Sequence, residues 1–207
     1  MADDFTTMFP EPAPSEVIDT LTLWATHYRV HTAAHDPAGI ALVDKNNLAL
    51  GPKLTRRDFC EAAMQGTVTV SNDTGTATYN SYNAGRRQLA DCVPFYARAI
   101  RLDRIKRSVV ERLGRMRFFR TSAEYGHGVK SWHLRPFRTI AVDSSGHPIP
   151  YRSVVYIPNV RGLQVTLPNG QNITHDGYFF AADTGANIKT NHINIFGGVS
   201  TANPFPG

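Results

Sequence analysis

The sequence lacks several features, and each absence excludes a class of protein. Its apolar runs are all short, and none approaches the roughly 18–20 residues that a helix needs to cross a bilayer. Residues 1–11 are acidic and polar, without the basic and apolar segments of a signal peptide. We therefore expect no membrane insertion. Three origins stay open: a protein retained in the cytoplasm where it is made, export without a recognisable signal peptide, and a chain that has lost its leader.

Cysteine is also scarce, because Cys60 and Cys92 are the only two in the chain. Neither lies in a CxxC pair or beside His-rich spacing, so the pair does not predict a zinc site. Two alternatives stay open, namely two buried thiols or a disulfide formed in an oxidising compartment. We expect no metal and no cofactor.

The 207 residues include 42% hydrophobic and 10% aromatic side chains, enough to bury a core. This length suits one large domain, or a compact domain with a sizeable insertion. The net charge of +5 favours an anionic partner, which could be nucleic acid, anionic lipid or a cell-wall polymer.

A basic stretch occupies residues 86–120. Within it, apolar residues at three- and four-residue steps predict an amphipathic helix over part of the stretch: Leu102, Ile105, Val109 and Leu113. The arginines are interpreted either as the solvated face of that helix or as a surface for a phosphate- or carboxylate-bearing polymer. Nucleic acid is not the expected partner, because no readout motif or interleaved aromatic platform accompanies the charge.

The chain before the basic stretch predicts a few short elements. Residues 1–20 are typical of a flexible arm, 21–30 of a first strand and 31–52 of turns. A short helix is expected from Thr55, which can cap it, to a stop at Gly66, followed by a hairpin around the turn at 72–75.

From Leu134 the sequence changes to short strands separated by Gly and Pro, and this spacing is typical of a small barrel. The expected strands are 139–142, 153–157, 164–167, 178–182 and 193–196.

Three of these strands carry a notable polar residue. Asp143 and Asp183 directly follow the strands at 139–142 and 178–182, and Asn194 lies within the strand at 193–196. A carboxylate directly after an apolar strand is desolvated on one side, which raises its pKa and suits it to general acid work. Each aspartate alone is better explained as a turn residue. Together they indicate a site.

The segment HDGYFFAADTGANIKTNHINIF, residues 175–196, resembles the 3D (three-aspartate) domain, whose pattern is approximately AxDxGGxIKGxxxD. Residues 136–158 resemble the opening of that domain, and WATHY at 24–28 is similar to its first strand, ATxY. The resemblance implies a mainly β fold with some α, a six-stranded double-psi β-barrel with a helical and hairpin insertion. The barrel would comprise 21–30 and 134–198, with 31–133 as the insertion and 199–207 as a loose tail.

The resemblance further implies an MltA-type lytic transglycosylase acting on peptidoglycan glycan strands. Such an enzyme protonates the MurNAc–GlcNAc bond with one aspartate, which then acts as a base on the muramoyl 6-hydroxyl and yields a 1,6-anhydro product. One carboxylic acid suffices because the substrate supplies the nucleophile, unlike the two-carboxylate glycosidases.

The sequence departs from the family at the catalytic aspartate, eleven residues after Asp183, where Asn194 stands. Asparagine keeps the shape of aspartate but carries no titratable proton. Two explanations compete, an engineered inactivation of an enzyme and a natural non-catalytic, expansin-like wall-binding protein.

The resemblance implies roles for further residues. Asp183 would be the partner carboxylate, and Asp143 a structural third aspartate. Substrate-binding candidates are Thr26, Tyr28, Thr184, Lys189 and His192. A solvated loop for Lys189 and a packed ring for His192 are equally good interpretations. Trp24 and Trp132 could be sugar platforms, although core packing is favoured for Trp24 on its apolar strand.

Wall degradation without a leader is typical of a phage-type lysin or an exported antibacterial effector. It would act in the periplasm or cell wall, and its partners would include an immunity protein or a secretion-apparatus component.

Overall fold

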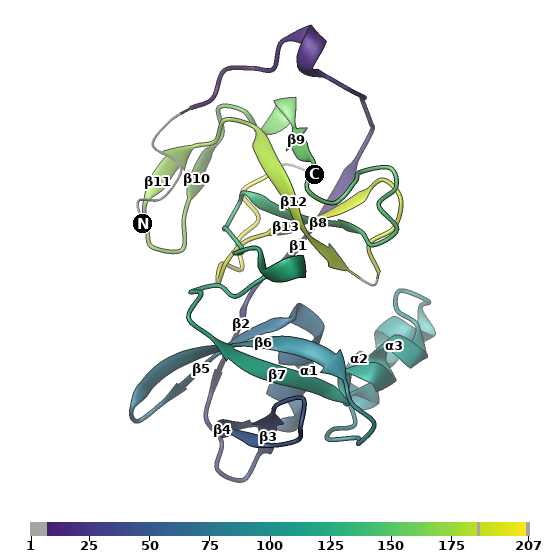
Figure 1. Cartoon of the computed structure of the whole chain (residues 1–207), viewed down its shortest axis with the longest axis vertical. Helices are drawn as coiled ribbons and strands as arrows, with labels where there is room; N and C mark the ends of the chain where they lie inside the picture. The colour runs from purple at the N-terminus through teal and green to yellow at the C-terminus, as the bar shows by residue number, and fades with distance from the viewer. Residues whose placement is uncertain (1–7, 186, 206–207) are drawn as a thin grey trace. The chain divides into compact units, whose positions relative to one another are not determined.

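The computed structural model describes residues 8–185 and 187–205, which form two compact units. One unit combines Met1–Arg29 with Gly128–Gly207, and the other is Val30–His127 (Figure 1). The predicted divisions fell after residues 30 and 133. Part of the predicted arm (1–7), part of the predicted tail (206–207) and residue 186 lie outside the described residues.

The first unit contains a five-stranded sheet in the order β1-β13-β8-β12-β9 and a separate hairpin of β10 and β11 (Figure 1). Its strands are β1 (Trp24–Tyr28), β8 (Thr139–Asp143), β9 (Val154–Tyr156), β10 (Gln164–Thr166), β11 (Asn172–Thr174), β12 (Tyr178–Gly185) and β13 (His192–Phe196). Short 3-10 helices are η1 (Pro14–Glu16), η2 (Val129–Ser131) and η3 (Pro158–Val160). All five strands expected after residue 134 are confirmed, and β11 was missed.

The core of this unit lies against β8, whose five residues are all buried. Ile140 and Val142 pack with Phe179, Ile193 and Ile195 in one apolar cluster. The prediction of a loose tail is wrong at one position, because Phe205 is buried in this cluster and lies edge-on to the Phe137 ring. The mainly β class is confirmed. The six-stranded double-psi barrel stays a prediction, because this sheet pairs five strands among the described residues.

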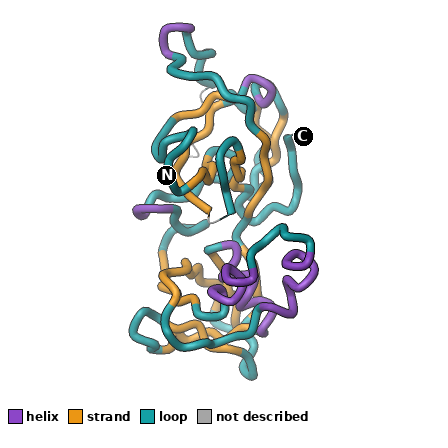
Figure 2. The backbone as a smooth tube through the Cα atoms, turned by 90° about the vertical axis from the view of Figure 1, so that its right-hand side faces the viewer, coloured by secondary structure: helices purple, strands orange, loops and turns teal. Residues whose placement is uncertain are grey.

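The second unit contains the sheet β2-β5-β6-β7 and the hairpin β3-β4. Its elements are β2 (His31–Ala34), β3 (Ile40–Val43), β4 (Ala49–Leu54), α1 (Arg56–Gln65), β5 (Thr67–Asn72), β6 (Gly75–Ala84), α2 (Val93–Arg101), α3 (Arg107–Leu113) and β7 (Met116–Thr121). The helices gather on one side of the strands (Figure 2).

Local signals at α1 and the hairpin are confirmed. The Thr55 side chain accepts a hydrogen bond from the Asp58 N–H, and Gly66 ends the helix in the left-handed conformation. Asn72 pairs with Gly75 at the β5–β6 turn. The turn interpretation of 31–52 is wrong, because this segment forms β2, β3 and most of β4. Its few β-branched residues hid strands that tertiary pairing stabilises.

The basic stretch forms two helices and a strand, and α3 contains Val109 and Leu113 of the predicted apolar period. Leu102 caps the end of α2 and Ile105 lies in the loop before α3, so the apolar period crosses a break. Arg117 on β7 is buried, and its guanidinium donates to Asn47 Oδ1 at 3.0 and 2.6 Å. Cys60 and Cys92 form a disulfide with 5.5 Å between their Cα atoms, which decides between the two alternatives.

No helix among residues 8–185 and 187–205 is long and apolar enough to cross a membrane. Part of the predicted arm is held by specific contacts. Tyr178 donates its hydroxyl to the Pro10 carbonyl at 2.9 Å, and Arg161 donates to the Phe9 carbonyl at 2.8 Å.

Candidate functional site

The parallel pairing of β1 with β13 brings most of the predicted site residues together. Residues in register on neighbouring strands lie on the same face of a sheet. Three such pairs follow one another on one face: Trp24 with His192, Thr26 with Asn194, and Tyr28 with Phe196. Each pair is in direct contact through its side chains.

Asp183 reaches the same face through an irregularity in β12. Ala181 pairs with Ile140 of β8, but the register then shifts, so that Asp183 pairs with Ala141. Ala141 also pairs with Asn194 on its other side. If the register had continued unshifted past Ala181, Asp183 would pair with Val142, a residue of the core cluster. The bulge therefore places Asp183 two strands from Asn194 with only the small side chain of Ala141 between them.

The surroundings of Asp183 make it a carboxyl that can hold a proton. It is partly buried, and burial raises its pKa to about 6. Hydrogen bonds from the Thr184 N–H at 2.9 Å, the Tyr28 hydroxyl at 2.9 Å and the Val129 N–H oppose this rise. Tyr28 is the partner that stays protonated, because burial and then the charge of Asp183 raise its pKa well above the usual value.

Thr26 links residue 194 to His192. Its hydroxyl donates to Asn194 Oδ1 at 3.0 Å and lies 2.7 Å from His192 Nε2. A hydroxyl has one proton, so His192 Nε2 must donate to Thr26 whenever Thr26 donates to residue 194. Burial lowers the pKa of His192, and a hydrogen bond with the Asn187 backbone opposes that shift. The protonation of the imidazole therefore sets the direction of the hydrogen bonds from His192 through Thr26 to Asn194.

Asp143 lies at the end of β8 and closes a loop. It accepts hydrogen bonds from the Ser145 N–H at 2.9 Å, the Thr190 N–H at 3.1 Å and Lys189 Nζ at 3.2 Å. The backbone hydrogen bond from Ser145 is the largest cause of a pKa well below the usual range for this carboxyl. The structure thus places Lys189 against Asp143 rather than beside Asn194, and the charge of Asp143 orders the loop that leads to β13.

The expectation that Trp24 packs in the core is wrong. Its side chain is 57% exposed, and β1 is the last strand of the sheet. Trp132 is 41% exposed, and its ring lies 5.0 Å from Phe180 and 6.0 Å from the Arg152 guanidinium.

Sequence reasoning missed the segment that covers Asp183. Val129 in η2 donates its N–H to Asp183, and its carbonyl accepts the Tyr151 hydroxyl at 2.6 Å. A Cβ at Gly128 would collide with the Ala182 carbonyl, so this close approach requires glycine. The glycine was the one available signal, and nothing local distinguishes it from a turn glycine.

Sequence reasoning also missed a buried ion pair in the same unit. Arg138 Nη2 donates to Asp176 Oδ2 at 3.0 Å, and the Asp176 side chain is fully buried. Asp176 also accepts the Tyr178 N–H at 3.0 Å, where β12 begins. This pair fixes the start of β12 rather than facing Asn194.

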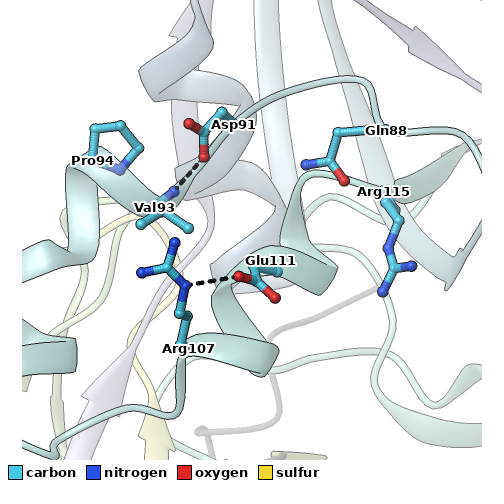
Figure 3. A pocket seen from close by; sticks show the side chains of 7 residues that line it. All are labelled: Gln88, Asp91, Val93, Pro94, Arg107, Glu111 and Arg115. Carbon is cyan, nitrogen blue, oxygen red and sulfur yellow. Dashed lines mark hydrogen bonds and ion pairs between the residues drawn. The ribbon is translucent and has the colours of Figure 1, made fainter.

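A surface hollow of about 510 Å³ lies entirely in the second unit (Figure 3). In it Arg107 pairs with Glu111 at 2.8 Å, and Asp91 accepts the Val93 N–H at 3.0 Å. None of the predicted site residues lines it. Among the described residues, no cluster of His, Cys, Asp and Glu could hold a metal ion.

Comparison with known proteins concerns the family and the fold of the chain. Residues 138–203 match the family model of the 3D domain. These residues are a 3D domain. It contains Asp143, Asp183 and Asn194. A search of curated proteins found no relative by sequence.

Solved structures place the 3D domain in a larger fold of the MltA type. Escherichia coli MltA with bound chitohexaose matches at a TM-score of 0.50 and 18% identity, over 86% of this chain and 65% of that one. A membrane-bound lytic murein transglycosylase from Agrobacterium tumefaciens matches at 0.47 and 12%, over 84% and 67%. The lytic transglycosylase LtgG of Burkholderia pseudomallei matches at 0.41 and 18%, over 85% and 65%. The chain thus spans 65% of the length of the E. coli protein.

Proposed function

We propose that this chain binds the glycan strands of peptidoglycan and is a lytic transglycosylase whose proton-transfer position holds asparagine. The observation that carries the proposal is the in-register row of Thr26, Asn194, Ala141 and Asp183 on one face of the sheet. The match to the 3D family and the likeness in fold to E. coli MltA support it.

The roles follow from the contacts. An aspartate at 194 would protonate the glycosidic oxygen of the MurNAc–GlcNAc bond and then take the proton of the muramoyl 6-hydroxyl, giving a 1,6-anhydro sugar. Asp183 would stabilise positive charge on the oxocarbenium-like sugar. Thr26 and His192 would position residue 194. Tyr28 and Thr184 would position Asp183, because the Tyr28 hydroxyl and the Thr184 N–H both donate a hydrogen bond to the Asp183 carboxylate.

We extend the proposal to the finer fold. Tyr28 and Asp183 are hydrogen-bonded although β13 and β8 lie between their strands, so the sheet must curve strongly around this face. This curvature supports a six-stranded double-psi barrel built from 21–30 and 134–198, with 31–133 inserted.

Asn194 determines what the present form can do. An amide keeps the hydrogen bond with Thr26 but has no proton to transfer near neutral pH. This form therefore binds glycan strands and does not cleave them at an enzymatic rate. An expansin-like binding protein is the second candidate. It is favoured equally, because the amide oxygen of Asn194 accepts the Thr26 hydrogen bond as a carboxylate would, without a proton to transfer. Action in the periplasm or cell wall, as a lysin or effector with an immunity or secretion partner, belongs to the same proposal.

The test is Asn194→Asp on purified sacculi, with release of 1,6-anhydro-muropeptides followed by mass spectrometry. We expect release to rise by about 10²-fold or more, the usual contribution of a general acid. Asn169→Asp is the matched control, because it makes the same charge change on an exposed turn where Oδ1 accepts the Gln171 N–H at 2.9 Å.

If folded Asn194→Asp protein releases no anhydro products, the hypothesis that the chain is a lytic transglycosylase is wrong. Sedimentation of both forms with sacculi would then leave the binding protein as the function. If neither form sediments with sacculi, the whole proposal fails.

A further inference from the structure

The pair formed by Trp24 and His192 is arranged as a platform. The two rings are stacked with 3.7 Å between their centroids and 4° between their planes. Trp24 is 57% exposed although His192 covers one face of its indole, so its exposed surface must lie mainly on the opposite face and the outer edge. No other ring contact of Trp24 occurs among the described residues.

The backbone of Trp24 and the ring that backs its indole are both held by other contacts. The Trp24 N–H of the backbone donates to the Asn191 carbonyl at 3.1 Å, and His192 is buried. His192 is in turn held by Thr26, 2.7 Å from its Nε2. An exposed aromatic ring that is already ordered loses little conformational freedom when a ligand covers it, which favours binding.

The platform lies next to the proposed reaction position. Trp24 precedes Thr26 by two residues on the same face of β1, a distance of roughly 7 Å along a strand. A glycan strand that runs along β1 from Trp24 would therefore pass Thr26, which hydrogen-bonds Asn194.

The chemistry of the ligand follows from the platform. A β-linked sugar with equatorial substituents presents axial C–H groups on its ring faces, and these form an apolar patch that fits an aromatic face. We infer that Trp24, backed by His192, is a stacking subsite for one pyranose ring of a β-1,4-linked N-acetylated glycan. The inference rests on the proposed function and names its substrate subsite.

The first experiment measures binding of chitohexaose by calorimetry to the unaltered chain, Trp24→Ala and Trp24→Phe. We expect Trp24→Ala to weaken binding about tenfold or more, and Trp24→Phe to recover part of the loss. Tyr82→Ala is the matched control, because it removes a 48% exposed aromatic ring from the other unit. Maltohexaose, with α-linkages, should not bind measurably.

The second experiment needs no change at Trp24. The chain has two tryptophans, so Trp24 alone emits in the Trp132→Phe variant. Its emission should shift to shorter wavelength when chitohexaose is added, because stacking removes water from the indole. This result would locate the sugar even if Trp24→Ala failed to fold.

His192 separates stacking from hydrogen bonding. His192→Phe keeps an aromatic ring against Trp24 but cannot bond Thr26, and His192→Ala removes both contacts, so His192→Phe should bind chitohexaose more tightly than His192→Ala does.

The outcomes distinguish this inference from the proposed function. Two results together would show that the platform is wrong and leave the proposed function standing. Trp24→Ala would bind chitohexaose as well as the unaltered chain does, and Trp24 emission in the Trp132→Phe variant would not change. If the unaltered chain binds neither chitohexaose nor sacculi, both fail. Equal binding of maltohexaose would overturn the assigned ligand class.

Discussion

Asp143 and Asp183 follow apolar residues on β8 and β12, two strands that pair side by side, yet the structure shifts their pKa values in opposite directions. Asp143 accepts two backbone N–H groups and the ammonium of Lys189. Asp183 accepts two backbone N–H groups and a neutral phenol, and burial outweighs them. The ammonium of Lys189 beside Asp143, and a neutral phenol beside Asp183, distinguish a carboxylate that orders a loop from a carboxyl that can hold a proton.

The comparison shows that a carboxylate after a strand is not by itself a general acid. Its protonation depends on what the rest of the chain brings to it. At Asp143 the partners come from residues 145 and 189–190, which favour the charged form. At Asp183 burial is the largest cause and favours the neutral form, although the hydrogen bonds from Thr184, Tyr28 and Val129 oppose it.

Among variants that test the contrast between Asp143 and Asp183, Asp183→Asn should change the free energy of unfolding most. The usual pKa of an unfolded aspartate is about 3.9, whereas the folded value is about 6. Between these values the folded chain binds the extra proton, so stability falls as pH rises and the full cost is present above pH 6. Asp183→Asn should therefore stabilise the first unit by about 1–3 kcal/mol at pH 8 and by little at pH 4.

Urea unfolding followed by tryptophan fluorescence measures this, because Trp24 and Trp132 both lie in the first unit. A loss of stability at pH 8, or the same change at both pH values, would contradict the assigned environment of Asp183.

Asp143→Asn should have the opposite sign and a smaller effect. The folded pKa is depressed, so the stability from ionised Asp143 is present above about pH 4 and is lost as pH falls through the folded value. The variant should unfold at lower urea than the unaltered chain at pH 7, and the two should converge in acid. Asp19→Asn, at an exposed aspartate of the same unit, is the control and should show no such pH dependence. Equal stability at pH 7 would show that Asp143 does not clamp its loop.

The smallest expected effect is a change in the pKa of His192, which tests how residue 194 is coupled to that imidazole. An asparagine can rotate its amide and either donate to or accept from Thr26, whereas an ionised aspartate can only accept. Asn194→Asp should therefore hold the Nε2 proton on His192 and raise the pKa of that imidazole. A ¹⁵N NMR titration of the histidines measures this, with Asn169→Asp as the control. An unchanged His192 pKa would mean that Thr26 does not couple the two residues.

Much of the local structure could be predicted from the sequence. Strand propensity and turn residues located the five strands after residue 134, and Thr55 and Gly66 marked the two ends of α1. The spacing of Asp143, Asp183 and Asn194 pointed to the 3D domain. The strands in 31–54 escaped because their side chains have weak strand propensity and their stability comes from pairing. Trp24 escaped because exposure depends on strand order, which a single strand does not encode.

The sequence by itself therefore determined which side chains are available, including the replacement of a titratable group by Asn194, since chemical identity is local. Only the tertiary structure decided where they meet. The register shift in β12 paired Asp183 with Ala141, which also pairs with Asn194. Trp24 lies exposed on the terminal strand β1, and Val129 donates to a carboxyl more than fifty residues away. The physical reason is that register, strand order and burial arise from contacts between distant segments, and these contacts set both the face and the protonation of each side chain.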